Sequence, residues 1–257
     1  MGDLSIDTAV EPRSEGRYRA TLSADWEIWG PMGGYVAACA LRAAGASSPH
    51  PRPAAFACHY LGVARFEPVD IVVETRRAGR TASSQRVEIT QEGRPILDAM
   101  VWSAADVDGL EHDETTAPDV PGPDALASIT ELVPEDALPP FPFWNNFDGK
   151  PIAFEADWPP DGPRPACWQE WLRFLPAATF DDPWVDAARS VGATAAVERR
   201  APIPGGTSPS GPGSGARAAG TEPVVRARAP ARGRRCARRR RTTLRGRGPR
   251  GCCGGGR

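Results

Sequence analysis

The chain has 257 residues, of which 40% are hydrophobic, and its formal net charge is −1. This length allows one large domain or two small ones. We see no charged and then apolar leader and no apolar run long enough to cross a bilayer, and the six cysteines have no paired spacing. We therefore expect a cytoplasmic protein without disulfides or a membrane anchor.

The small net charge hides a division of the chain near residue 190. Residues 191–257 carry 16 of the 31 basic residues, all arginine, and only two acidic residues, which gives a net charge of +14. Residues 1–190 have a net charge of −15 and contain all eight tryptophans. A segment of Gly, Pro, Ala and Arg without aromatic residues cannot bury enough apolar surface to offset its ordering entropy. We therefore predict a disordered Arg/Gly/Pro-rich tail over residues 191–257.

A helix is predicted over residues 33–44. This segment contains one charged residue, Arg42, and it is followed by Gly45, which we expect to end the helix. A surface helix has a polar face, and this helix has none. We therefore expect it to be buried on most sides.

Segments with the alternation typical of strands follow this helix; they are residues 56–63, 69–74, 86–90 and 96–102. The breaks between them contain Glu67-Pro68, Gly79-Arg80 and a turn around Gly93, which suits the left-handed position of a tight hairpin. Connections this short require antiparallel neighbours. We predict an α+β fold in which residues 17–104 form one antiparallel sheet curled around the helix.

Two further regions precede the tail. Residues 105–140 are acidic and proline-rich and are predicted to be a linker. Residues 141–190 begin to repeat the first unit, with an aromatic turn at 143–149, a strand at 168–175, and a helix whose expected N-cap is Asp182 before Pro183. Asp186 in that helix is interpreted as a solvated side chain. The repeat is unfinished at Ser190, where the arginine-rich tail begins.

Three motifs resemble those of one family: residues 26–38 (Trp-Glu-Ile-Trp-Gly-Pro-Met-Gly-Gly-Tyr-Val-Ala-Ala), 79–87 (Gly-Arg-Thr-Ala-Ser-Ser-Gln-Arg-Val) and 91–96 (Gln-Glu-Gly-Arg-Pro-Ile). They are similar to the helix start and the closing hairpin of the first unit in double hot-dog acyl-CoA thioesterases. The resemblance covers residues 17–104 and continues at a lower level through 141–190. It implies a hot-dog fold, with one complete unit in residues 1–104 and an incomplete second unit in 141–190.

The resemblance also implies a reaction, the hydrolysis of an acyl-CoA to a free acid and coenzyme A by an activated water. Gly33 and Gly34 match the helix start that offers backbone N–H groups to the thioester oxyanion. The candidates for substrate binding share aromatic, thioether or cationic side chains near the matched motifs; they are Trp26, Trp29, Met32, Tyr35, Arg77 and Arg80. Purely structural roles for these residues stay open. The glycines would then only shape a tight helix start, and the aromatic residues would belong to the core. The arginines would be solvated, and His59 would be a structural residue of a strand.

In the resembled family, an Asp, a Thr or Ser, and a Gln of the second unit activate the water. These positions would fall beyond Ser190, where the sequence departs from the pattern, so the catalytic residues stay unassigned. We predict that the chain is a frameshifted product of a longer thioesterase gene and that its activity is weak or lost. No cofactor is expected, because the CoA thioester is the substrate.

Other chemistries have less support. The chain has no Gly-x-Ser-x-Gly elbow and no metal-ligand spacing, and the Gly-x-Gly-x-x-Gly match at residues 246–251 follows no strand. Two alternatives to an active thioesterase remain, a non-catalytic acyl-CoA-binding remnant and a nucleic-acid-associated protein that uses arginines 232–250. The tail has no aromatic residues that could stack on the bases of a single-stranded nucleic acid. A homo-oligomer is expected by resemblance.

Overall fold

The computed structural model describes residues 1–193 except 109–113, 115, 117 and 156–167. Every described residue lies within the unit Met1–Val225. The predicted disordered tail, apart from residues 191–193, lies outside the described residues. The predicted change of reading frame close to Ser190 concerns the gene and stays a prediction.

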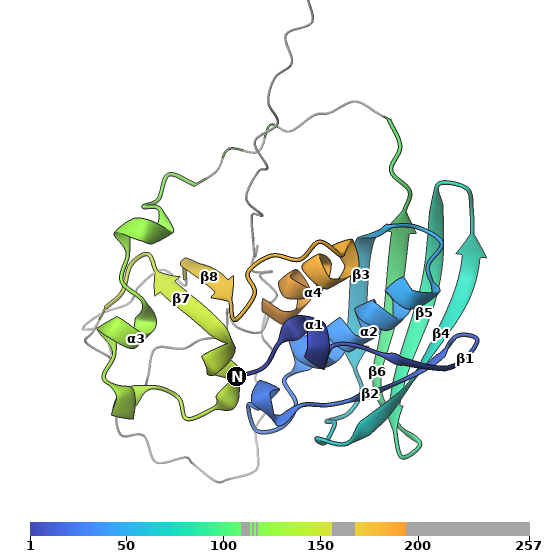
Figure 1. Ribbon diagram of the computed structural model, residues 1–257, viewed down its shortest axis with the longest axis horizontal. Helices are drawn as coiled ribbons and strands as arrows, with labels where there is room; N and C mark the ends of the chain where they lie inside the picture. Colours follow the sequence, from blue (N-terminus) through green and yellow to red (C-terminus); the bar gives the residue numbers. More distant parts are fainter. Residues whose placement is uncertain (109–113, 115, 117, 156–167, 194–257) are drawn as a thin grey trace, which may run out of the picture. The chain divides into compact units, whose positions relative to one another are not determined.

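A six-stranded antiparallel sheet forms the main layer, with the strand order β1-β2-β4-β5-β6-β3 (Figure 1). Its strands are β1 (Glu11–Ser14), β2 (Arg17–Thr21), β3 (Arg52–Tyr60), β4 (Pro68–Ala78), β5 (Ala82–Gln91) and β6 (Arg94–Ala104). All neighbouring strands pair antiparallel, as the short connections predicted. The sheet begins at Glu11 rather than at residue 17, because β1 adds an edge strand beside β2.

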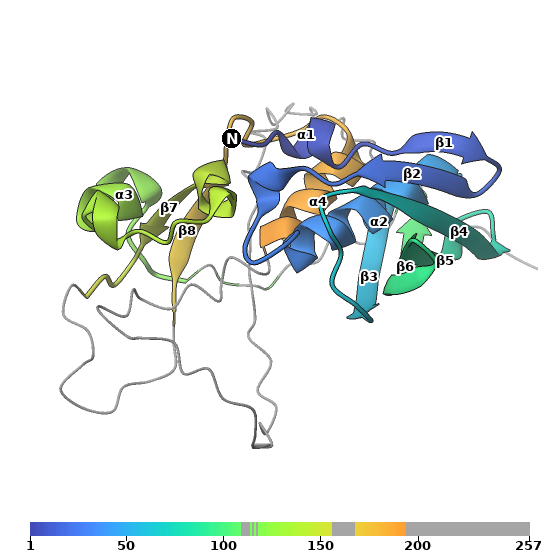
Figure 2. The ribbon, with the colours of Figure 1, turned by 90° about the horizontal axis from the view of Figure 1, so that it is seen from below.

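The central helix α2 (Gly33–Ser47) lies against one face of this sheet, as Figures 1 and 2 show. Ten of its fifteen residues are buried. Strands β3, β4, β5 and β6 contact it from one side. The predicted burial of an apolar helix inside a curled antiparallel sheet is therefore confirmed, and the fold is a hot-dog fold.

The predicted end of this helix at Gly45 is wrong. The helix continues to Ser47 and ends at Ser48, whose N–H donates to the carbonyl of Gly45 at 3.1 Å. A Cβ at position 45 would lie 2.6 Å from Cδ2 of Trp184. Gly45 therefore makes room for an indole from a distant part of the chain, and this contact cannot be read from the local sequence.

The turn between β5 and β6 has the predicted chemistry. Glu92 and Gly93 both have positive φ, 50° and 75°, which is the conformation of a type I′ hairpin. Its twist matches that of the two long strands that it joins. On the helix-facing side of β5 every second residue is buried, and the polar members of this row, Ser83, Gln85 and Gln91, lie toward its ends.

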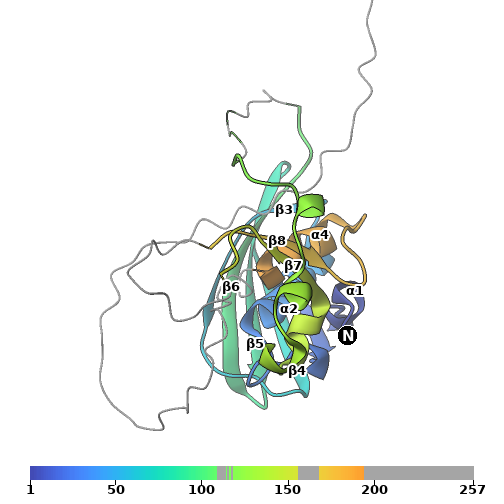
Figure 3. The same cartoon turned by 90° about the vertical axis from the view of Figure 1, so that its left-hand side faces the viewer.

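The second, incomplete unit contributes a 3-10 helix, a hairpin and a helix. They are η4 (Pro142–Asn146), β7 (Phe147–Pro151), β8 (Glu170–Phe174) and α4 (Pro183–Ala193). Figure 3 shows α4 beside α2, on the side of α2 that the sheet leaves open, and the two helices are in contact. As predicted, Asp182 caps α4, because its Oδ1 accepts the N–H of Trp184 at 2.8 Å.

The interpretation of Asp186 as a solvated side chain is wrong. Its carboxylate pairs with Arg189 at 2.6 Å and accepts the N–H of Phe180 at 3.3 Å. Two-thirds of the side chain is covered. The carboxylate thus fixes the loop before α4 to the first turns of the helix, because Arg189 in turn donates to the carbonyl of Ala178 at 2.7 Å.

Short helical elements complete the described residues: α1 (Leu4–Asp7), η1 (Ala24–Trp26), η2 (Pro123–Ala125), α3 (Ile129–Leu132) and η3 (Glu135–Ala137). The last three lie in the predicted linker. Ile129 and Val133 are buried there, so this connection packs on the rest of the unit. Over the described ranges, no helix has the length and hydropathy to cross a membrane.

We expect the core around α2 to respond strongly to truncation. Leu41→Ala removes a side chain that is 1% exposed, and should lower the free energy of unfolding by about 2–5 kcal/mol in a urea titration. Leu61→Ala is the matched control, because Leu61 is 56% exposed and its loss should change stability by less than about 0.5 kcal/mol. Equal effects of the two substitutions would contradict the burial of α2.

An ion pair on the outer face of the sheet should make the stability of the fold depend on pH. Two guanidinium nitrogens of Arg86 donate to the two carboxylate oxygens of Asp98 at 3.0 and 2.7 Å, and this lowers the pKa of Asp98. A carboxyl whose pKa is lower in the folded state stabilises the fold at neutral pH, and this contribution is lost as the pH falls below about 4. The stability difference between wild type and Asp98→Asn should therefore be positive at pH 7 and shrink toward zero in acid. Asp119→Asn, at an exposed linker position, is the control and should leave the profile of wild type unchanged.

Candidate functional site at the start of the central helix

The N-terminus of α2 contains both glycines that were predicted to bind an oxyanion. Gly34 is buried, and its N–H donates to the thioether sulfur of Met32, the N-cap residue, at 2.9 Å. Gly33 is partly exposed. The unsatisfied N–H groups of a helix start carry partial positive charge, so this end of α2 favours a developing negative charge.

Each glycine is covered by a different neighbour. A Cβ at position 34 would lie 2.6 Å from the carbonyl oxygen of Val191 and 3.0 Å from that of Gly192. These carbonyls belong to the last turn of α4. A Cβ at position 33 would lie 3.1 to 3.4 Å from atoms of the Tyr60 phenol, at the end of β3. The start of α2 therefore meets the negative end of α4 at Gly34 and a side chain at Gly33.

Trp26 and Tyr35, two of the predicted substrate-binding residues, lie in the core. Both are 0% exposed, and their rings stack at 5.1 Å between centroids. Asp7 binds both, because its carboxylate accepts Trp26 Nε1–H at 2.9 Å and its carbonyl accepts the Tyr35 hydroxyl at 2.8 Å. Burial raises the pKa of Tyr35. Contact of these two rings with an acyl chain stays a prediction.

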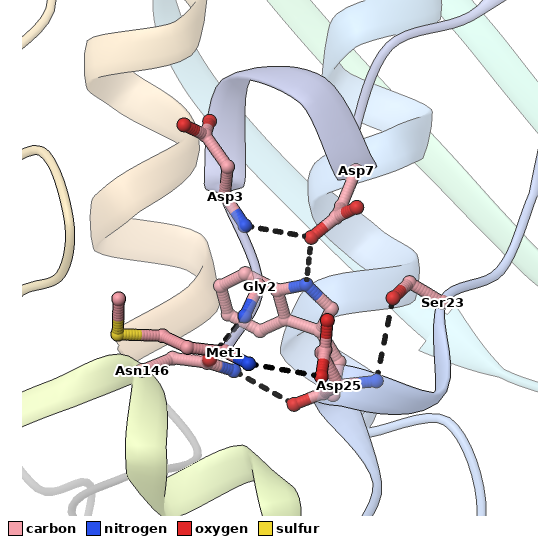
Figure 4. A network of polar contacts seen from close by, with 8 residues as sticks. Met1, Gly2, Asp3, Asp7, Ser23, Asp25 and Asn146 are labelled. Carbon is pink, nitrogen blue, oxygen red and sulfur yellow. Dashed lines mark hydrogen bonds and ion pairs between the residues drawn. The ribbon is translucent and has the colours of Figure 1, made fainter.

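A network of polar contacts joins the N-terminal residues to Asp25, Asn146 and Asp7 (Figure 4), and the Asp7 carboxylate binds Trp26. The Gly2 N–H donates to Oδ1 of Asn146 at 2.7 Å, and Nδ2 of Asn146 donates to the carbonyl of Asp25 at 2.8 Å. Asp3 N–H donates to the carboxylate of Asp7 at 2.8 Å. The network connects α1, η1 and η4, so the second unit is attached to the first close to the start of α2.

Trp29 is placed differently from Trp26. Its indole is 86% exposed, its φ is +62°, and it lies in the tight turn just before α2. The ring of Phe141 contacts it edge-on at 5.5 Å. A non-glycine residue at positive φ costs free energy, and such strain often accompanies a functional surface. Of the predicted aromatic residues, Trp29 is therefore the one available to a ligand at this end of the helix.

Arg77 and Arg80 lie toward the other end of α2. Both are exposed. The turn that contains Arg80 contacts His50, because Nε2 of the His50 ring lies 3.1 Å from the carbonyl oxygen of Gly79. His50 follows the C-terminus of α2, about 20 Å along the helix from Gly33. The structure thus does not bring these arginines to the glycines. A coenzyme A that contacts both would have to extend along the unit.

Besides Tyr35, three groups in or near the helix have raised pKa values. Burial raises the pKa of the Cys39 thiol to about 12, and burial also raises the pKa of the Cys58 thiol and of the Tyr60 hydroxyl. These groups are therefore protonated at neutral pH. His59 is exposed on β3 and lies opposite Asp98 of β6. In the described part of the chain, no group of three or more His, Cys, Asp or Glu side chains is arranged to hold a metal ion.

The helix α2 wrapped by an antiparallel sheet, with α4 ending at its N-terminus, defines a hot-dog protein, and similar solved structures support this fold. A hot-dog protein of unknown function from Alicyclobacillus acidocaldarius has a TM-score of 0.62 at 22% identity, over 74% of this chain and 68% of its own. The tesB protein of Mycobacterium avium subsp. paratuberculosis has a TM-score of 0.56 at 22% identity, over 75% and 68%. Acyl-CoA thioesterase II TesB2 from Mycobacterium marinum has a TM-score of 0.56 at 19% identity, over 74% and 67%. The chain thus spans about two-thirds of the length of these proteins.

Residues 22–104 match the family model of the acyl-CoA thioesterase N-terminal domain. This range includes the turn of Trp29, the whole of α2, and strands β3 to β6. Residues 22–104 of the chain are therefore similar to the N-terminal domain of acyl-CoA thioesterases. The resemblance stated from the three sequence motifs is confirmed.

Several residues at this end of α2 were not found from the sequence. Asp7 and Asn146 form the contacts around Trp26, and Tyr60 covers Gly33. The pattern Asp3-Leu4-Ser5, in which Asp3 caps α1, is a local signal that was overlooked. The contacts of Asn146 and Tyr60 depend on segments more than 25 residues away, and no local pattern marks them.

The two glycines should tolerate alanine unequally. Gly34→Ala places a methyl group against backbone carbonyls, which cannot move without shifting α4, and should lower the free energy of unfolding by about 1–3 kcal/mol. Gly33→Ala meets only a side chain, Tyr60, which can rotate away, so its effect should be the smaller. Urea unfolding of both variants measures the difference. A Gly34→Ala protein as stable as Gly33→Ala would contradict the close contact with α4.

Proposed function

We propose that this protein binds an acyl-CoA at the start of α2 and belongs to fatty-acid metabolism as a thioester hydrolase with impaired turnover. The family match of residues 22–104 carries this proposal. Gly33 lies at the positive end of α2 and is partly exposed, and exposed Trp29 lies four residues earlier in the turn before the helix. The products are a free acid and coenzyme A.

The chemistry follows from the helix start. Backbone N–H groups aimed at a thioester oxygen stabilise the oxyanion that forms when water attacks the carbonyl carbon. The apolar ring of Trp29 supplies contact area for an acyl chain at low cost in conformational entropy. The resembled family activates its water with residues that would lie beyond Ser190, where the sequences diverge, and this is the reason that we propose impaired turnover.

The remaining expectations belong to the same proposal. The protein acts in the cytoplasm and forms a homo-oligomer. The edge strand β3 supports an oligomer. Among the described strands it pairs only with β6, and it is the longer of the two edge strands, so its other edge offers backbone groups to a second copy. Non-catalytic binding of acyl-CoA is the second candidate function, and it requires the same helix start without the activated water.

Binding of acyl-CoA is tested with a matched pair of tryptophan variants. Trp29→Ala should weaken the binding of hexanoyl-CoA about threefold to tenfold in calorimetry, because it removes apolar contact near Gly33. Trp102→Ala is the control, since Trp102 is a 47% exposed indole on β6 outside this site. Equal affinities of the two variants would contradict the placement of the site.

Turnover is measured separately, by release of the coenzyme A thiol from the same substrate. We expect turnover far below that of a family member with a complete second unit. Rapid turnover would contradict the proposed impairment, and binding without turnover would favour the acyl-CoA-binding remnant. A nucleic-acid role of the arginine-rich tail predicts salt-sensitive binding that a chain ending at Ala193, the last residue of α4, lacks.

A further inference from the structure

We propose that the side chain of Met32 occupies the oxyanion-binding N–H of Gly34, so that a thioester carbonyl must displace the Met32 thioether before it can use this donor. The inference rests on the proposed function, because it concerns the same helix start. It assigns Met32 the role of a positioning residue that closes the site, rather than that of a residue lining an acyl tunnel.

The geometry at Gly34 supports this assignment. The Met32 sulfur lies 2.9 Å from the Gly34 nitrogen, and Cε of Met32 lies 3.1 Å from the position of a Cβ on Gly34. Met32 is 5% exposed, and Gly34 is buried. The side chain therefore both accepts the N–H and shields it from water.

The choice of acceptor makes displacement feasible. A thioether sulfur is a weak hydrogen-bond acceptor, whereas a thioester carbonyl, and still more its oxyanion, accepts strongly. Methionine is also flexible, with three rotatable bonds beyond its Cα. The common N-cap residues Ser, Thr, Asp and Asn would bind the same N–H with an oxygen and would hold it more firmly.

The C-terminus of α4 adds to the closure. The carbonyl oxygens of Val191 and Gly192 lie against Gly34 on the side where a Cβ would project. Their partial negative charge opposes a second negative oxygen at that side. A substrate carbonyl can therefore reach the Gly34 N–H from the side that Met32 covers, and movement of Met32 alone opens this approach.

A series at position 32 tests the proposal on the full chain. Met32→Leu keeps the volume and removes the acceptor, and Met32→Gln supplies an oxygen at similar length. Amide hydrogen exchange at Gly34 in the free protein should be about threefold to tenfold faster in Met32→Leu than in wild type, and slower in Met32→Gln. Met100→Leu and Met100→Gln are matched controls, because Met100 lies 47% exposed on β6.

The affinity for hexanoyl-CoA, measured by calorimetry on the same proteins, should follow the opposite order. Met32→Leu should bind it about threefold to tenfold more tightly than wild type, and Met32→Gln more weakly. A purely structural cap would change the unfolding midpoint without reversing the order of affinities. Exchange at Gly34 that ignores residue 32, or affinities that ignore it while binding persists, would overturn the proposal. If no variant binds but the exchange order holds, the capping contact stands and the proposed function fails.

Discussion

Burial of α2 on most sides is the constraint on which the rest of the fold depends. A sheet can cover only one side of a helix, and α2 has no polar face to leave in water. The other side is covered by α4, whose Trp184 packs at Gly45 and whose last carbonyls pack at Gly34. The small residues at these two positions let the helices approach closely. The helix of the incomplete second unit is therefore part of the core of the first.

The same constraint explains the aromatic cluster at the start of α2. Trp26 stacks on Tyr35 and contacts Phe143, Phe147 and Phe174 of the second unit edge-on or tilted. Its indole N–H and the Tyr35 hydroxyl must be paired when they are buried, and Asp7 supplies both acceptors. Residues that looked like a binding surface in the sequence thus join the two units, and the N-terminal residues are required to satisfy them.

Local pattern was enough for most of the fold. Alternation marked β4, β5 and β6, the turn at Gly93 fixed the register of β5 and β6, and the absence of a polar face marked α2. The two errors have different causes. The role of Gly45 depends on Trp184, which is distant in sequence, whereas Asp186 has local partners, Arg189 in the same helix and Phe180 in the preceding loop. The site was predicted less well because, as at Gly45, its contacts join segments that are distant in sequence. Gly33 lies at the start of α2, whereas Arg80 lies in a turn near the other end of this helix. Only the packing shows that Trp26 is buried while Trp29 is exposed.

The electrostatics of this helix start also limit what the protein can do. An oxyanion needs donors that face it and an environment without competing negative charge. At Gly34 the donor is already bound to Met32, and two carbonyl oxygens of α4 lie beside it. These carbonyls stabilise the free protein, because they are the negative end of one helix against the positive end of another. What stabilises the resting fold therefore opposes the transition state, and catalysis requires that Met32 release the Gly34 N–H despite the nearby carbonyls or that Gly33 act as the main donor.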